Sequence, residues 1–454
     1  MHIRQSEQSP LDSAWHQKLG PLLEALGETF RALELDPLSN SQALLDFKAS
    51  GFRKSPELYP SGDMGKFNEI RAALVQLTRE VSGDEDNPLI REAYCDRIDE
   101  LILNVDLVTA AIAKDDTAFK TANRAIYGEP NYDIFAAACA WIRSDLEDAS
   151  GLSAEAAAAR DAALELLPSD GGNPELLMPT GEVFAAVKLE HERPGGYLHQ
   201  LFAGTIIPAN QDISRTTGDT ITSQVMGNVG SDFKLTESPS GLWAVLQSSG
   251  QVIAPKHYQM SPEAFKGIIS HEIGSHLLES RNGQHAKLRL LEYGMDRYEL
   301  GNEGRAYLRE QIMFDNMPDY IHQGGWYPTK PTWQYRLSIH IVISLAAGLS
   351  GRKYDFAELY KLVTALFRYW GLSLGTINEE SVMAGGWSMV TRALKGTSGS
   401  GGAYYKDIVY LEGNVRCWEV ARSRPDLIFQ GDKGKFDIAN PKHVKILEAL
   451  TIIP

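Results

Sequence analysis

Apolar residues recur at three- and four-residue intervals through most of residues 10–170, with acidic and other polar residues between them. Two segments show this pattern most clearly, LGPLLEALGETFRAL at 19–33 and IREAYCDRIDELILNVDLVTAAIA at 90–113. An alanine-rich segment, LSAEAAAARDAALELLP, continues the pattern as far as Pro168. This spacing is typical of amphipathic helices. We therefore expect a helical N-terminal region over residues 1–170.

The pattern changes after SDGGNP at 169–174, which contains turn-forming residues and no apolar side chain. Residues 195–255 are rich in Gly, Thr, Ser and β-branched residues, as in YLHQLFAGTIIPANQD at 197–212 and GLWAVLQSSGQVIAP at 241–255. Such segments predict short strands joined by turns. We expect a domain boundary at the break and a second region over 175–454.

A helix is predicted to follow these strands, beginning with SPEAFKGIIS. Ser261 can cap it, Pro262 suits the first helical position, and Glu263 suits the positive end of the helix dipole. Two further helices are expected around 299–315 and 333–350. The fold class that we predict is α+β and mainly helical.

Composition and charge limit the function classes. The chain has 454 residues, 43% of them apolar, which is ample material for a hydrophobic core. Its formal net charge of -15 argues against a general nucleic-acid binder, which needs a basic face, and against an anionic membrane surface as the main partner. The longest apolar segment, IHIVISLAAGLSG at 339–351, falls short of the roughly 18 residues that a membrane span requires, and predicts a buried helix.

The cysteines and the N-terminus bear on the compartment. Cys95, Cys139 and Cys417 are odd in number and far apart, which favours reduced thiols. The N-terminal sequence MHIRQSEQSPLDSAW lacks the apolar core of a signal peptide. We expect a cytoplasmic protein.

The candidate chemistry lies in HEIGSH, residues 271–276, which nearly matches the zinc-protease motif H-E-x-x-H. Its two histidines are five positions apart, whereas those of the motif are four apart. In a regular helix, residues five apart lie about 140° around the axis, so both imidazoles could not reach one ion. One extra residue in a π-bulge would restore convergence, and Gly274 would tolerate the distortion. Glu272 could then act as general base on a zinc-activated water. The alternative is two partly exposed histidines on an amphipathic helix.

A zinc site of this kind needs a third ligand, and the next segment offers several carboxylates. They are Glu292, Asp296, Glu299, Glu303 and Glu310. Spacing alone does not choose among these five.

Several segments together resemble one family. HEIGSHLLESRNG (271–283), NEGRAYL (302–308) and KDIVYLEG (406–413) are similar to motifs of the tyrosine carboxypeptidase-like zinc metallopeptidases. FKTANRAIYGEP (119–130) also resembles that family's helix ending in Y-G-x-P. The family includes the microtubule-associated tyrosine carboxypeptidases and bacterial flavohaemoglobin expression-modulating proteins with a Q-E-G-L-A motif.

The resemblance implies a zincin-like catalytic domain over 175–454 that binds one zinc ion per chain. His271 and His276 would be zinc ligands, and NEGRA, which corresponds to Q-E-G-L-A, assigns the third ligand to Glu303. Glu272 would be the general base. The family's characterised members imply carboxypeptidase action on a peptide or protein C-terminus. Hydrolysis by another zinc amidase or endopeptidase, and a metal-binding regulatory or pseudoenzyme module, are the alternatives.

Two departures and three further candidates concern the substrate. Asn302 and Arg305 replace the usual Gln and Leu around Glu303, and an arginine there would change the charge of the site. Tyr410 could donate to the oxyanion, and Lys406 or Arg392 could bind a terminal carboxylate. The alternative for KDIVYLEG is a helix start with a structural Lys–Asp pair.

Three other features receive predictions. The strand-like segment 241–255 could hold an extended peptide along its edge, or form an ordinary core hairpin. His285 is expected at the surface or beside the site, and His340 in the core. GTSGSGG at 396–402 lacks the G-K-[ST] ending of a phosphate loop and is expected to be a mobile loop on the substrate side.

Overall fold

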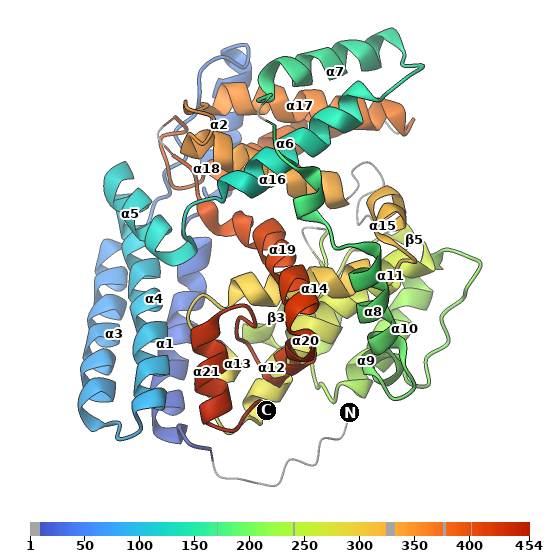
Figure 1. Ribbon diagram of the computed structural model, residues 1–454. Coiled ribbons are helices and arrows are strands. Elements are labelled where there is room, and N and C mark those ends of the chain that lie inside the picture. The colour runs from blue at the N-terminus through green and yellow to red at the C-terminus, as the bar shows by residue number, and fades with distance from the viewer. Residues whose placement is uncertain (1–9, 170, 239–240, 324–331, 376–377, 401) are drawn as a thin grey trace.

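The computed structural model describes residues 10–454 except 170, 239–240, 324–331, 376–377 and 401. The described chain is mainly helical with few strands, as predicted (Figure 1). The predicted helices of the N-terminal region are confirmed. They are α1 (Ser13–Arg31), α2 (Pro37–Ala49), α3 (Met64–Asp84), α4 (Pro88–Ile112), α5 (Asp116–Tyr127), α6 (Tyr132–Glu147) and α7 (Ala154–Leu166).

The starts of these helices follow from their capping residues. A side chain just before each helix from α2 to α7 accepts a hydrogen bond from a first-turn amide, which would otherwise have no partner. The capping residues are Asp36, Asp63, Asn87, Asp115, Asn131 and Ser153. Short polar side chains therefore fix where the helices begin.

The segment predicted to form short strands, residues 195–255, contains strands in only part of its length. The elements between residues 174 and 260 are η1 (Pro174–Leu177), α8 (Gly181–Glu192), α9 (Tyr197–Leu201), β1 (Ile213–Ser214), α10 (Arg215–Asn228), β2 (Lys234–Glu237), β3 (Ala244–Leu246), η2 (Gln247–Ser249), β4 (Gln251–Ala254) and β5 (Gln259–Met260). Strands within 241–255 are confirmed. The strand prediction for 197–212 is wrong, because α9 and turns occupy it.

Helix α10 was also missed. Its sequence is rich in Thr, which favours strands, but Ile221, Thr222 and Val225 are buried at three- and four-residue spacing. Packing of that face on the core outweighs the weak strand propensity of the individual residues.

The strands of the described residues form two small sheets. β2, β4 and β3 lie in that order, with β2 parallel and β3 antiparallel to β4. β1 pairs antiparallel with β5. Strand β3 is therefore an edge of its sheet, with Val245 opposite Val252.

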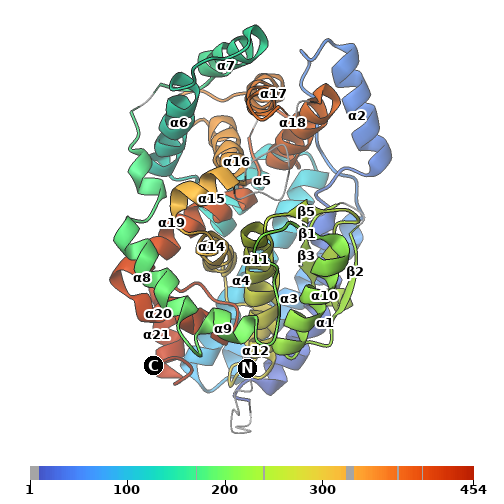
Figure 2. The same cartoon turned by 90° about the vertical axis from the view of Figure 1, so that its right-hand side faces the viewer.

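The rest of the chain is helical, and the predicted helices at 261, 299–315 and 333–350 are confirmed. The elements are α11 (Pro262–His271), η3 (Glu272–Leu277), α12 (Leu278–Gln284), α13 (Leu290–Tyr293), α14 (Glu299–Gln311), α15 (Met317–Gln323), α16 (Thr332–Ala347), α17 (Phe356–Ser373), α18 (Glu379–Leu394), η4 (Tyr405–Asp407), α19 (Ile408–Ser423), α20 (Pro425–Gln430), η5 (Gly431–Lys433) and α21 (Pro441–Ala449). Helices α14 and α19 pack along each other near the middle of both views (Figures 1 and 2).

One hydrophobic cluster draws buried side chains from both sides of the predicted boundary. It includes Leu74 and Leu101 from the N-terminal helices, and Leu308 and Leu366 from α14 and α17. Helix α7 packs on α17, and α6 on α16. A smaller cluster lies between α10, α11 and β4. The two predicted regions therefore share a hydrophobic core, and the domain boundary at 169–174 remains a prediction.

Two expectations about the environment can be compared with the structure. None of the described helices is long and apolar enough to cross a lipid bilayer. Cys95, Cys139 and Cys417 form no disulfide with one another, as expected from their spacing. Burial raises the pKa of the Cys417 thiol, which keeps that side chain protonated and unreactive.

Candidate metal centre

The helix that carries both histidines begins as the sequence predicts. The Ser261 hydroxyl accepts a hydrogen bond from the Ala264 amide, and Pro262 follows at the first helical position. The helix then continues without interruption from α11 through η3 into α12. Its middle segment, Glu272–Leu277, is a π-helix. The predicted extra residue is thus accommodated as a π-turn between the two histidines.

Gly274 lies in this π-turn, but close packing gives a second reason for a glycine there. A Cβ at Gly274 would lie 1.8 Å from the hydroxyl of Tyr197 and 2.9 Å from Leu201, both on α9. The Gly274 carbonyl accepts a hydrogen bond of 2.8 Å from the buried guanidinium of Arg309. The neighbouring helices therefore hold the π-turn in place, because a side chain at this position would displace α9.

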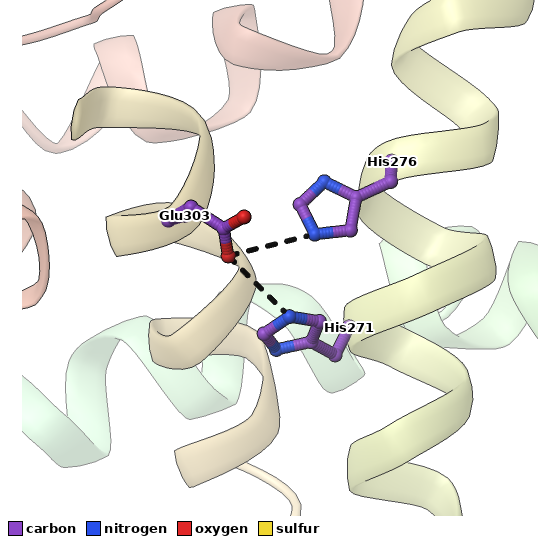
Figure 3. Close-up of side chains that lie close together, drawn as sticks. All are labelled: His271, His276 and Glu303. Carbon is purple, nitrogen blue, oxygen red and sulfur yellow. Dashed lines mark ion pairs between the residues drawn. The ribbon is translucent and has the colours of Figure 1, made fainter. Parts of the chain in front are cut away.

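The π-turn brings both imidazoles to one side of the helix, facing α14 (Figure 3). The Nε2 atoms of His271 and His276 each lie 3.7 Å from Oε2 of Glu303. Among the described residues, these three side chains form the one cluster whose ligand atoms could hold a metal, all within 4.8 Å of one another. The three predicted ligands thus come together.

The donor set fits zinc. A tetrahedral zinc ion with bonds of about 2.0–2.2 Å places its ligand atoms about 3.3–3.6 Å apart, close to the two distances above. Oε2 of Glu303 is buried and has no hydrogen-bond partner, a costly state that a cation between it and the imidazoles would relieve. Two imidazoles and one carboxylate leave a fourth position open, as in catalytic zinc sites.

Two glycines determine how α14 presents Glu303. Helices α14 and α19 approach so closely that a Cβ at Gly304 would lie 2.1 Å from the Gly413 carbonyl oxygen. A Cβ at Gly413 would lie 2.1 Å from the Leu300 carbonyl oxygen. Both glycines belong to the family-like motifs, and their contact puts Glu303 and Tyr410 on walls of the same cavity.

The structure also separates Glu303 from the other four carboxylates. Each of those has a different partner: Glu292 with His16, Asp296 with His443, Glu299 with Lys406, and Glu310 with Nδ1 of His271. Glu303 is the one that faces both Nε2 atoms.

We expect Glu303→Gln to weaken zinc affinity far more than Glu299→Gln. The amide removes the charged ligand, whereas Glu299 lies on the same helix and is engaged with Lys406 at 3.6 Å. Competition with a fluorescent zinc chelator would measure both affinities. Equal and small losses in the two variants would contradict the choice of Glu303.

Glu310 is one of the five carboxylates considered as a third ligand, and in the structure it lies beside His271. Its Oε2 lies 3.2 Å from Nδ1 of His271, whereas Glu303 faces Nε2, the other nitrogen of that ring. Tyr320 donates a hydrogen bond of 3.4 Å to the other oxygen of Glu310. Burial would lower the pKa of His271, but Glu303 and Glu310 outweigh it and raise the pKa to about 10. In a metal-bound site, where the ring must be neutral, a carboxylate at Nδ1 would keep the proton on that nitrogen and leave Nε2 free to bind the metal.

We predict that Glu310→Gln lowers zinc affinity about ten- to a hundredfold, as is usual for the loss of a group that orients a histidine ligand. The measurement is the same chelator competition. Glu263→Gln, at the start of the same helix as His271, is the control and should bind zinc like wild type. An unchanged affinity in Glu310→Gln would mean that the contact does not orient His271.

Glu272 lies in the same cavity as the three candidate ligands and is 5% exposed. The main-chain amide of Val245 on β3 stabilises its charged form. Burial nevertheless raises the pKa of the carboxyl to about 7, with Glu303 and Glu310 adding to the effect and His271 opposing it. A carboxylate of this kind is suited to proton transfer near neutral pH.

The cavity has a volume of about 610 Å³ and is bounded by elements from across the chain. Residues 242–247, which include the edge strand β3, form one wall. Other walls come from α14, from Tyr335 and Arg336 on α16, and from Arg392, Lys406, Tyr410 and Lys435. The predicted strand edge therefore borders the site, as peptide binding along it would require.

The three predicted substrate-side residues all line this cavity. Burial raises the pKa of the Tyr410 phenol, which remains a hydrogen-bond donor. Arg392 makes a bidentate pair with Asp407, and Lys406 lies 3.6 Å from Glu299. Asp407 thus pairs with Arg392 rather than with its neighbour Lys406, and much of the hydrogen-bonding capacity of Arg392 is already used.

Arg305 and Asn302, the two departures from the family motif, lie differently relative to the cavity. Arg305 is 1% exposed and forms ion pairs with Glu279 and Asp432, and it does not line the cavity. The prediction that Arg305 changes the charge of the site is therefore wrong, because Glu279 and Asp432 neutralise this arginine. Asn302 does line the cavity, and its amide donates a hydrogen bond to Glu279.

Three remaining predictions can be compared with the structure. His285 is exposed, and His340 is buried with Nε2 2.9 Å from Glu412, both as expected. The loop at 396–402 is not on the substrate side. Its main chain bonds to Leu58 and Phe356, and its described residues do not line the cavity.

Sequence reasoning missed Arg336 altogether and did not recognise the role of Glu310. Glu310 lies seven residues after Glu303, so helical spacing places both on one face of α14 and could have indicated a shared role. No local signal marks Arg336, since its surroundings come from α14, α16 and α19.

Neither the models of protein families, nor the curated proteins, nor the solved structures contain a match to this chain. The family resemblance therefore depends on the motifs at 119–130, 271–283, 302–308 and 406–413.

Proposed function

We propose that this protein is a zinc-dependent peptidase that acts on the C-terminus of a peptide or protein. The observation that carries the proposal is the cluster of His271, His276 and Glu303 with Glu272 in the same cavity. Two imidazoles, one carboxylate and a neighbouring buried carboxylate are the arrangement that metal-assisted hydrolysis needs. A zincin-like domain over 175–454 is part of the same proposal.

Each side chain has a role that follows from its surroundings. A zinc ion held by the three ligands would supply Lewis acidity that polarises the scissile carbonyl and makes water more acidic. Glu272 would accept the proton of the attacking water and pass it to the leaving amine. Tyr410, protonated because burial raises its pKa, would donate a hydrogen bond to the oxygen that gains negative charge.

The edge strand β3 supports a peptide as the substrate class. Its residues 244–246 line the cavity, and its outer edge is not paired with a described strand. An extended peptide could add to that edge through main-chain hydrogen bonds. Because Val245 of the same strand contacts Glu272, peptide binding and proton transfer would be aligned by one element.

Glu272 also bears on the alternative of a metal-binding regulatory module. A site that only binds metal has no use for a buried carboxylate beside its ligands, and burying that charge costs stability. The position of Glu272 therefore favours hydrolysis.

Two measurements on the purified protein test the proposal. Elemental analysis should find about one zinc per chain, and digestion of a mixed peptide library should release single C-terminal residues, read by mass spectrometry. Internal cleavage would keep the hydrolysis and overturn the C-terminal specificity. Full zinc occupancy with no cleavage of any peptide would favour the regulatory module.

A further inference from the structure

Among the described residues, four lysine and arginine side chains line the cavity that contains the candidate metal ligands. They differ in their hydrogen-bond and ion-pair partners. Arg392 is paired with Asp407, Lys406 lies near Glu299, and Lys435 donates a hydrogen bond to Gln247. Arg336 has no hydrogen bond and no ion pair with any described residue. Its Nε atom is buried without a partner.

Two tyrosines hold the Arg336 guanidinium in place. Its central carbon lies 4.5 Å from the ring centroid of Tyr307 and 4.2 Å from that of Tyr410. Aromatic faces attract a guanidinium and fix its plane, yet they accept none of its N–H groups in a full hydrogen bond. The guanidinium is therefore positioned, and none of the described residues forms a hydrogen bond or ion pair with it.

A buried guanidinium N–H that lacks a hydrogen-bond partner has a free-energy cost, which a bound ligand can relieve. Removal from water lowers the pKa of Arg336, although a guanidinium remains charged at neutral pH. A planar, fixed guanidinium offers two parallel N–H groups, which match the two oxygens of a carboxylate. An anionic group entering the cavity would supply the missing partner.

The position of Arg336 relative to the metal ligands suggests which carboxylate this is. The ring of Tyr307, which contacts Arg336, lies 4.9 Å from the ring of His271. One tyrosine ring thus separates the cation from a zinc ligand. In a peptide, the terminal carboxylate follows the last scissile carbonyl by a single residue, a span of about 3.5 Å.

We infer that Arg336 binds the terminal α-carboxylate of the substrate and thereby selects the last peptide bond. This assignment rests on the proposed function and replaces Lys406 and Arg392 in the role that the sequence suggested for them. Tyr307 and Tyr410 orient the guanidinium, and Tyr410 would also face the reacting carbonyl.

A binding experiment tests the assignment without turnover. Full-length Glu272→Gln protein, loaded with zinc, is equilibrated with two N-acetylated octapeptide libraries of the same sequences, one with free C-terminal carboxylates and one with carboxamides. Bound peptides are counted by mass spectrometry. We expect the free acids to bind about tenfold or more tightly than the amides, the range for a charge-assisted hydrogen bond to a buried partner.

Second substitutions in that protein locate the preference. Arg336→Met should reduce the ratio of acid to amide affinity to within about twofold. Arg336→Lys, which keeps the charge but loses the planar pair of donors, should give an intermediate ratio. Lys435→Met, which removes another cation of the same cavity, should leave the ratio unchanged. Equal binding of acids and amides, no detectable binding of either, or a preference that persists in Arg336→Met would overturn the inference.

Cleavage of the peptides by wild type is measured separately from binding. Digestion of the free-acid library by wild type, combined with equal affinities for acids and amides, would keep the peptidase and overturn the role of Arg336. A preference that depends on Arg336, combined with no cleavage by wild type, would keep the carboxylate site and overturn the hydrolytic function.

Discussion

Glu272→Gln is expected to reduce the rate of peptide cleavage about a hundredfold or more, the scale of losing a general base. The amide has the same shape as the carboxyl and still accepts the hydrogen bond of the Val245 amide, but it cannot take up a proton. Zinc occupancy should stay near that of wild type, because Glu272 is not one of the three residues whose ligand atoms converge. Initial rates on a cleaved library peptide and elemental analysis measure the two quantities.

The control for this substitution is Glu263→Gln, which changes a carboxylate in the first turn of the same helix, away from the cavity. It should cleave like wild type. Undiminished cleavage by Glu272→Gln would show that this residue is not the base. A regulatory module predicts a third result, with no cleavage by either wild type or variant.

His276→Ala should lose most of the bound zinc. The substitution removes one of the three proposed ligands and leaves only His271 and Glu303, too few protein ligands to hold zinc tightly. The measurement is the zinc content of protein purified without added metal, with circular dichroism as the check that the helices are intact. Loss of zinc should be accompanied by loss of cleavage.

His285→Ala is the matched control, because His285 ends the same helical segment but is exposed and contacts none of the candidate ligands. It should retain the zinc content of wild type. Full zinc occupancy in His276→Ala would mean that the ligands are assigned wrongly.

The sequence predicted the local structure well where periodicity and capping agreed. Ser261 and Pro262 fixed the start of the helix that carries both histidines, and the five-residue spacing required a π-turn if both were to bind one ion. These are short-range consequences of hydrogen bonding and helix geometry. Helix α10 was missed because its Thr-rich composition outweighed its helical periodicity in the prediction.

The third ligand required more than spacing. Five carboxylates follow the histidines, of which Glu292 and Asp296 lie before α14. The rotation of α14 decides which of its own three, Glu299, Glu303 or Glu310, faces the Nε2 atoms. That rotation is set by the contact of Gly304 with Gly413, which are far apart in the chain. The family resemblance selected Glu303 in advance, and the packing supplies the physical reason.

The sequence by itself thus determined most of the helices, the start of the helix that carries both histidines, the π-turn and the residue types of the candidate metal site. Only the tertiary structure decided that Arg305 is neutralised, that Arg392 is paired with Asp407, and that Arg336 lies between two tyrosines with no hydrogen-bond or ion-pair partner among the described residues. Helical hydrogen bonds join residues close in sequence, so local patterns predict them. The charge state of a cavity depends on partners from distant helices, and no local pattern records which side chains will meet there.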